Sequence, residues 1–293
     1  MSKPILFPVL QEKNIHERDK NIIFIEKGHK YIIQTDPHSK YTSVTTWNHS
    51  HFPHFDADKI IKKMMSGKSW NKEHKYWGQT PYQIKQGWDS NKNNVSSAGT
   101  DLHFQIECFM NNRHLPDGYQ HSDLYDYYYQ ENRQKSVTTL EEKEKEQIIS
   151  KEWTYFLKYI EDFPDFKPYR TEWIIYHEEL KLAGSIDMVY ENPDGTLNIY
   201  DWKRAKNIST INNFNNFALT YEISHLPDSN FWHYALQLNT YKAILEEKYN
   251  KKIKDLYLVR LHPDAEENSY ELIKLPDLQK EIKELFKERS KIN

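Results

Sequence analysis

The sequence predicts one α/β or α+β domain with a helical N-terminal part. Residues 171–180 and 182–206 are rich in β-branched and aromatic residues and surround a strong turn signal, Asn192-Pro193-Asp194-Gly195. Residues 231–249 carry apolar side chains at helical spacing, and a further strand pattern follows at 253–262. Strands that alternate with a long helix in this way are typical of a sheet packed against helices.

Neither an internal repeat nor a Pro- or Gly-rich linker divides the chain. The sequence therefore predicts a single domain over residues 1–293. Within it, we expect N-terminal strands and a helical arch in residues 1–94, and the core of the domain in residues 95–293.

The composition excludes several classes of protein. The chain has 293 residues and a net charge of −3, so it is not a polycation held to nucleic acid by net charge alone. Its single cysteine, Cys108, excludes an intramolecular disulfide, a four-cysteine zinc site and a cysteine-ligated iron–sulfur cluster. The sequence shows no membrane-length apolar run and no signal peptide at its start. These features predict an intracellular protein of a reducing compartment, such as the cytoplasm or nucleus, without membrane contact.

The N-terminal part is expected to contain a hairpin and three helices. Residues 21–36 read as two short strands around a turn, and residues 41–47 as a further β-rich run. A helix begins after Asp56 or Asp58, a second near Pro81, and a third after Ser96 or Ser97.

The remaining elements follow from the same patterns. Residues 123–165 predict a long helical region that contains the charged run EEKEKEQ, which is typical of a solvated helix face. Residues 205–230 form an Asn-rich connection. The helix over 231–249 is predicted to be amphipathic, and a short strand at 270–275 precedes a terminal helix.

One segment combines basic and aromatic residues. Between Lys59 and Lys92 the chain carries eight lysines against two acids, with aromatic residues among them. Such a pattern suits single-stranded nucleic acid, because lysines contact phosphates while rings stack on bases. It also fits a plain helical pair with an aromatic core and lysines at the surface. The candidate nucleic-acid-binding residues are Lys62, Lys63, Lys68, Trp70, Lys72, Lys75 and Trp77.

The turn at residues 192–195 predicts the register of the hairpin. The order Pro-Asp-Gly suits a three-residue loop in which a type I turn is followed by a left-handed glycine. In that register Asp187 lies opposite Asp201, and both share a face with Lys203. A two-residue loop would shift the register by one residue and separate the two aspartates.

Two opposed carboxylates repel each other unless something holds them together. A divalent cation with oxygen ligands would do so, and Mg²⁺ commonly uses one or two carboxylates. The alternative is an exposed face on which Lys203 neutralises Asp187 and Asp201. The cost of opposed like charges favours the metal.

These residues resemble a known signature. Asp187, followed across a hairpin by Asp201-Trp202-Lys203, resembles the motif of PD-(D/E)XK nucleases. Further similarities to RecB-type members are GTDLHFQIE with His103, Glu172 before LAGSIDMV, and QLNTY with Gln237 and Tyr241. The resemblance covers about residues 99–261. Among members of the family, the sequence looks similar to the mitochondrial genome-maintenance exonuclease and to related proteins of large DNA viruses.

The resemblance implies a restriction-endonuclease-like core with a central mixed β-sheet flanked by helices. It implies Mg²⁺ or Mn²⁺ bound by His103, Asp187, Asp201 and the backbone carbonyl of Trp202. Lys203 would position and help deprotonate the attacking water, or would balance charge on the phosphorane-like transition state. The other catalytic candidates it implies are Glu172, Gln237 and Tyr241.

The function implied is that of a metal-dependent exonuclease, which acts on single-stranded or end-exposed DNA and leaves a 5′-phosphate. The resemblance also implies a role in DNA repair or recombination. If the protein is viral, it would act at a viral replication site. The Lys59–Lys92 segment then becomes the arch that binds the strand, and residues 205–230 a lid ordered by substrate. The chain has no phosphate loop for ATP. The alternatives are a catalytically inactive nucleic-acid-binding protein with a nuclease fold, and a glycoside hydrolase that uses paired carboxylates.

Overall fold

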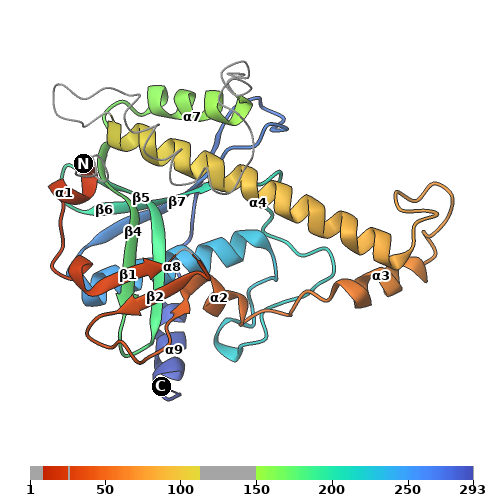
Figure 1. Ribbon diagram of the computed structural model, residues 1–293, viewed down its shortest axis with the longest axis horizontal. Coiled ribbons are helices and arrows are strands. Elements are labelled where there is room, and N and C mark those ends of the chain that lie inside the picture. Colours follow the sequence, from red (N-terminus) through yellow and green to blue (C-terminus); the bar gives the residue numbers. More distant parts are fainter. Residues whose placement is uncertain (1–8, 26, 113–149, 293) are drawn as a thin grey trace.

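The structure, a computed structural model, describes residues 9–25, 27–112 and 150–292. A mixed β-sheet lies at its centre, with helices on both faces (Figure 1). Its strands are β3 (Thr42–Ser43), β4 (Lys167–His177), β5 (Leu182–Glu191), β6 (Leu197–Lys203), β7 (Ile253–Arg260) and β8 (Glu271–Lys274). This architecture confirms the predicted fold class, a mixed α/β domain with a helix-flanked mixed sheet.

Strand β5 is the central strand for the site. One of its edges pairs with β4 along its whole length. Its other edge pairs with β3 in parallel at Leu182 and Ala183, and with β6 in antiparallel fashion from Met188 to Glu191. On that second edge, residues 184–187 of β5 pair with neither strand, because the pairing with β3 ends before them and the pairing with β6 begins after them. The candidate site forms at this interruption.

Each face of the sheet carries its own hydrophobic core. On one face, α2 (Val44–His49), α8 (Asn230–Lys248) and α9 (Gln279–Ser290) pack on the sheet. The other face is covered by α7 (Lys151–Asp162) and by the C-terminal half of α4 (Pro81–Asn112), as Figure 1 shows. The remaining N-terminal elements are α1 (Val9–Lys13), the turn η1 (Asp19–Asn21) and the predicted hairpin of β1 (Ile22–Ile25) and β2 (Lys30–Ile33).

Two predictions for the N-terminal part are wrong. The β-rich run over 41–47 is a strand only at Thr42–Ser43, because the Ser43 hydroxyl accepts a hydrogen bond from the Thr46 N–H at 3.1 Å and starts α2. The helices expected from Pro81 and from Ser96 or Ser97 are one helix, α4. Its serines lie within the helix rather than at a cap, and the helix runs across the expected border at residues 94 and 95.

The prediction that the helix α8 is amphipathic is also wrong. From Ala235 to Leu245 every residue except Gln237 is buried. The helix lies between the sheet and the flanking helices α2 and α9, so almost no face of it meets water. The run EEKEKEQ of the other predicted helical region lies outside the described residues, whereas Trp153 and Phe156 lie on α7 as expected.

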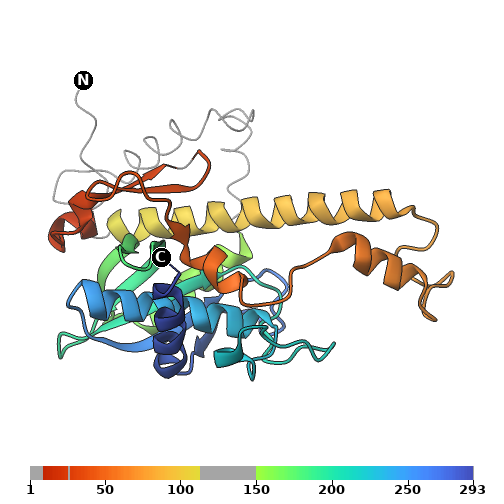
Figure 2. The same cartoon turned by 90° about the horizontal axis from the view of Figure 1, so that it is seen from below.

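An arm projects away from the sheet. It consists of α3 (Ala57–Met65), residues 66–80 and the first half of α4, up to residue 97 (Figures 1 and 2). Of the two predicted caps, Asp56 is the one that caps α3, through a 3.0 Å hydrogen bond from the Lys59 N–H. Residues 89–97 of α4 are all exposed, so this part of the helix crosses solvent without packing.

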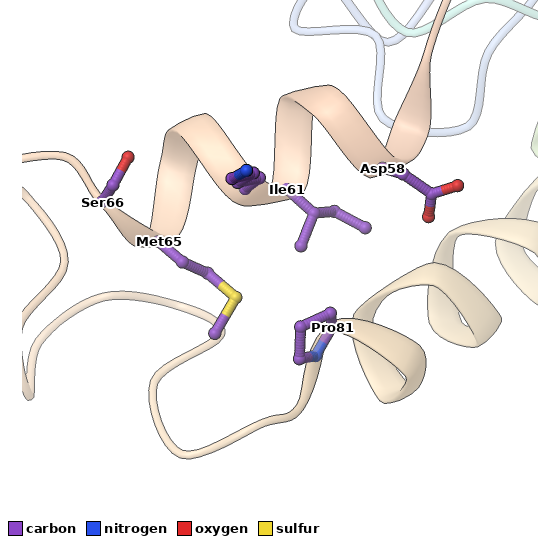
Figure 3. A pocket seen from close by; sticks show the side chains of 6 residues that line it. Asp58, Ile61, Met65, Ser66 and Pro81 are labelled. Carbon is purple, nitrogen blue, oxygen red and sulfur yellow. The ribbon is translucent and has the colours of Figure 1, made fainter.

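The two helices of the arm hold each other. Ile61 and Ile84 are buried where α3 meets the start of α4, and Lys85 pairs with Asp58 at 2.7 Å. An open pocket of about 420 Å³ lies beside this contact, lined by residues of α3, by Ser66 and by Pro81 (Figure 3). Within the described part of the chain, no helix combines the length and the apolar character needed to cross a membrane.

Candidate active site

The β5–β6 hairpin has the predicted register. Gly195 has φ +79°, and its N–H donates to the Asn192 carbonyl at 2.9 Å. The Asn192 N–H donates to the Thr196 carbonyl at 2.8 Å, which closes a three-residue loop. Met188 pairs with Tyr200, and their side chains join the core under α4 and α7. The next position in this register places Asp187 opposite Asp201, and both side chains lie on the other face of the hairpin.

Asp187 lies where β5 has no neighbouring strand on this edge. Its Oδ2 accepts a hydrogen bond at 3.0 Å from the backbone N–H of Trp202, on the adjoining end of β6. The side chain therefore takes the place of a ladder bond between the two strands. This contact fixes the carboxylate beside the Trp202 peptide unit.

The helix α4 brings His103 to the same point. Leu102, Ile106 and Met110 pack into the core and orient this half of the helix. As a result, His103 Nε2 lies 2.8 Å from the Trp202 carbonyl oxygen, and Nδ1 lies 3.4 Å from Asp187 Oδ2. The histidine thus touches two of its expected co-ligands, the Asp187 carboxylate and the Trp202 carbonyl.

Glu172 joins this group from β4. It lies between the pairs Thr171–Met188 and Trp173–Ile186, and so beside Asp187 across the sheet. Its φ of +42° is unusual for a residue with a side chain and disfavoured by about 1–3 kcal/mol. The Ser185 hydroxyl donates to Glu172 Oε2 at 2.8 Å. Burial, with the nearby charge of Asp187, raises the pKa of Glu172 well above its usual value.

Asp201 and Lys203 form the other half of the site. Lys203 Nζ lies 2.5 Å from Asp201 Oδ2, and the aspartate is only 3% exposed. Burial and the neighbouring Asp187 raise the pKa of Asp201 to about 6. Burial lowers the pKa of Lys203, but the attraction of the two aspartates outweighs it, so the pKa is raised and the ammonium stays charged.

The side chains fit a divalent cation. His103, Glu172 and Asp187 each offer one ligand atom, and these three atoms lie within 4.8 Å of one another. The oxygen Asp201 Oδ2 is buried beside this group without a well-oriented hydrogen bond, although Lys203 is close. Carboxylates and carbonyls are the ligands that Mg²⁺ and Mn²⁺ prefer. The three acids would repel each other at neutral pH, and a cation among them removes that repulsion.

Gln237 and Tyr241 lie next to the metal group but bond to each other. Gln237 Nε2 donates to the Tyr241 hydroxyl at 3.1 Å and to Thr45 Oγ1 at 3.3 Å. Tyr241 lies against Gly184, where a Cβ would come within 2.7 Å of the tyrosine ring. These contacts fix the helix face that borders the site.

Tyr234 also borders the candidate site, although no motif in the sequence indicates it. Lys203 Nζ lies over its ring, 4.7 Å from the ring centre. Tyr234, Gln237 and Tyr241 recur at i, i+3 and i+7, so they share one face of α8. That spacing before the QLNTY motif is the signal that would have found it.

The basic residues of the arm lie apart from this cluster. Lys62, Lys63, Lys68, Lys72 and Lys75 are all exposed, and Trp77 is 45% exposed. Trp70 is half-buried and packs against His74 and Trp77, with ring centres 4.7 and 5.8 Å away. The arm therefore combines a small aromatic core of its own with a lysine-covered surface.

A match to a known protein family shows that the chain is a nuclease. Residues 77–292 match the model of the PD-(D/E)XK nuclease superfamily. The match spans well over half of the chain, which therefore belongs to this superfamily and has its restriction-endonuclease-like fold. Its substrate is thus a nucleic acid, and nucleases of this superfamily use divalent metal ions, generally Mg²⁺ or Mn²⁺.

Solved structures give a weaker likeness. Seventeen of their chains match. One is the crystal structure of a "Putative exonuclease" from Eubacterium rectale, with 14% identity and a TM-score of 0.33 over 63% of this chain and 69% of that one. A likeness at this level carries no argument about activity. The curated proteins include no match.

Proposed function

We propose that the protein is a RecB-type member of the superfamily, similar to the mitochondrial genome-maintenance exonuclease and its viral relatives. It acts as a metal-dependent exonuclease on single-stranded or end-exposed DNA and leaves a 5′-phosphate. One observation carries this proposal. Four elements of the fold, α4, β4, β5 and β6, bring a histidine, three acids and a lysine to one point.

Each side chain has a role in this proposal. His103, Glu172, Asp187 and Asp201, with the Trp202 carbonyl, would hold Mg²⁺ or Mn²⁺. A bound cation of this kind polarises a phosphate oxygen and lowers the pKa of a bound water. The Lys203 ammonium balances charge that develops on the phosphate and orients the attacking water. Gln237 and Tyr241 hold the wall of the site beside Gly184.

The arm and the sheet core act together in this proposal, as one domain over residues 1–293. The lysines of the arm hold the phosphate backbone of the strand while its end lies at the site. Membership in the nuclease superfamily removes the glycoside hydrolase alternative. The catalytically inactive alternative is tested directly by the experiment below.

The test is cleavage of end-labelled DNA in Mg²⁺, Mn²⁺ or EDTA. We expect the wild-type protein to shorten linear single strands with a divalent ion and to leave closed single-stranded circles intact. Lys203→Ala should lower kcat by about 100-fold or more, because it removes transition-state stabilisation while leaving substrate binding in place. Lys206→Ala, at a 65% exposed lysine three residues away, is the matched control.

The outcomes separate the claims. No cleavage by the wild-type protein in either metal would contradict the enzyme, and cleavage of circles would contradict the exonuclease mode. Equal rates for Lys203→Ala and wild type would contradict the assigned mechanism. Identifying the terminal group on the released product tests the 5′-phosphate.

A further inference from the structure

The loop between β6 and α8 exposes an unusual set of apolar side chains. Phe214 and Tyr221 are 80% and 87% exposed, and Leu219 is 69% exposed. Ile211 and Phe217 complete the set of five within eleven residues. We call residues 208–221 the aromatic loop. Clustered apolar groups of this kind mark interaction sites more often than scattered single ones do.

The aromatic loop is anchored rather than loosely extended. The Asn212 side chain bonds to the Asp228 carbonyl and accepts from the Phe214 N–H at 2.8 Å. Nearer its start, the Trp232 indole donates to the Thr210 carbonyl at 3.0 Å. The fold thus fixes the backbone of the loop and presents its rings to solvent.

The loop lies between the site and the base of the arm. It starts five residues after Lys203, and α8, which carries Tyr234, begins nine residues after it ends. The Leu219 N–H donates to the His51 carbonyl at 2.7 Å, and His51 Nδ1 lies 2.8 Å from Thr220 Oγ1. His51 belongs to the short connection between α2 and the arm. Figure 2 shows the loop and the arm extending from the molecule in the same direction.

The charge of the loop indicates which ligand it suits. From Asn207 to Tyr221 the chain has no charged residue, whereas the neighbouring arm carries eight lysines. A neutral surface of rings and asparagines suits nucleic-acid bases, because every base has a face on which a ring can stack. The phosphates of the same strand would then meet the lysines of the arm. Bases in a duplex are stacked on each other, so only an unpaired strand fits both surfaces.

We propose that the aromatic loop is a base-stacking surface for single-stranded nucleic acid, with Phe214 and Tyr221 as its principal rings. It holds the unpaired strand between the arm and Lys203. This inference rests on the proposed nuclease function and specifies the form of substrate that reaches the site.

The test measures binding without cleavage. Fluorescence anisotropy of a labelled single-stranded thymidine oligonucleotide, in EDTA, compares wild type with Phe214→Ala/Tyr221→Ala. We expect affinity to fall roughly tenfold for each ring that is removed. Tyr221→Phe, which keeps the ring, should bind as wild type does. Ile15→Ala, at a 77% exposed apolar residue beyond α1, is the control for loss of apolar surface.

Salt and abasic sites distinguish stacking from charge. The double variant should keep the wild-type dependence of log K on log salt, whereas Lys68→Ser/Lys72→Ser should lower that slope by about 0.7 per phosphate contact. Wild type should bind an oligonucleotide with abasic sites more weakly than the intact one. The double variant should bind the two oligonucleotides equally, because it lacks the rings on which the bases would stack. Affinity for a blunt duplex should be the same for both proteins.

The proposal is overturned if the wild type does not bind the oligonucleotide, or if the double variant binds it as wild type does. A change confined to self-association, measured by sedimentation, would make the loop a protein interface and overturn it too. If the rings matter for binding but the wild type cleaves no DNA in Mn²⁺, the nuclease activity fails and the stacking surface stands.

Discussion

The Lys203 ammonium lies between two unlike partners. On one side it pairs with Asp201 at 2.5 Å, and on the other it lies over the Tyr234 ring. A ring face attracts a cation, by about 0.5–2 kcal/mol as burial increases. The tyrosine therefore acts as a positioning residue that limits where the lysine can point.

Removing this ring tests that role. We expect Tyr234→Leu to lower kcat by about three- to thirtyfold with little change in KM, because the lysine loses its orientation but the substrate keeps its contacts. Tyr234→Phe keeps the ring and should restore kcat. A rise in KM alone, or equal losses for Phe and Leu, would show that the ring does not act through Lys203.

At the scale of residues, the sequence predicts how the two aspartates of the candidate site are placed. Pro193-Asp194-Gly195 determines the turn, and the turn determines that Asp187 and Asp201 share a face. The positive φ of Glu172 could not be predicted, because no local pattern favours a left-handed glutamate inside a strand. Tyr234 was missed because its role depends on where α8 lies against β6, which is a tertiary contact.

Among the elements, the helix α8 packs closely on β5 because residue 184 is a glycine and has no Cβ. Tyr241 occupies the space where a Cβ of residue 184 would lie, 2.7 Å from the ring carbon Cε1. We expect Gly184→Ala to lower the free energy of unfolding by about 1–3 kcal/mol through overpacking. Urea unfolding measures this.

A double-mutant cycle identifies the cause. If the clash is with the ring, Gly184→Ala should add little further loss in a Tyr241→Leu background, because that variant removes the ring atoms. Gly87→Ala is the control, since nothing lies within 4 Å of its added Cβ. Additive losses in the cycle would show that the cost arises elsewhere.

His51 links the end of α2 to the aromatic loop, and its burial makes that link sensitive to pH. Burial, reinforced by Arg289 and opposed by Glu222, lowers the pKa of His51 to about 4. Unfolded histidine titrates near 6.5, so the unfolded state binds the proton first as pH falls. Stability is therefore unaffected above about pH 6.5 and falls between about 6.5 and 4.

We expect His51→Gln to remove part of this acid loss, on the order of 1–3 kcal/mol between pH 7 and pH 4. Urea unfolding at both pH values measures it. His38→Gln, at an exposed histidine, is the matched control. An unchanged acid loss in His51→Gln would contradict the role of this residue.

Element boundaries were predictable where local capping decides them, as Asp56 does for α3. They were not predictable where two signals compete. The run YTSVTTW has β-forming residues, yet Ser43 acts as an N-cap and most of the run is helical. Ser96 and Ser97 are residues that commonly cap a helix, yet both lie inside the single helix α4. Likewise, the burial of α8 on all sides depends on what covers it.

For the whole molecule, a metal ion would join parts that are far apart in the chain. His103, Glu172 and Asp187 come from α4, β4 and β5. A ligand that binds only the folded state stabilises all of it, by about 2.7 kcal/mol at 100 times its Kd. We expect Mn²⁺ to raise the midpoint of thermal unfolding, and EDTA to reverse the rise.

Asp187→Asn should abolish most of this rise while the metal-free protein stays folded, because an asparagine oxygen can still accept from the Trp202 N–H. Asp58→Asn, in the arm, is the control and should keep the full rise. A rise of equal size in Asp187→Asn would place the metal elsewhere.

The long helix α4 has a mechanical consequence. It carries the arm at one end and His103 towards the other, and at 1.5 Å per residue Pro81 and His103 lie about 33 Å apart along its axis. Between these two ends, residues 89–97 are exposed and have no packing to restrain them, while the hydrogen bonds of the helix keep this part stiff. If the arm holds a nucleic-acid strand as proposed, a strand that tilts the arm would also tilt α4 along its length. The movement would reach the His103 imidazole, which lies 2.8 Å from the Trp202 carbonyl oxygen, so a load on the arm would act on one of the proposed metal ligands.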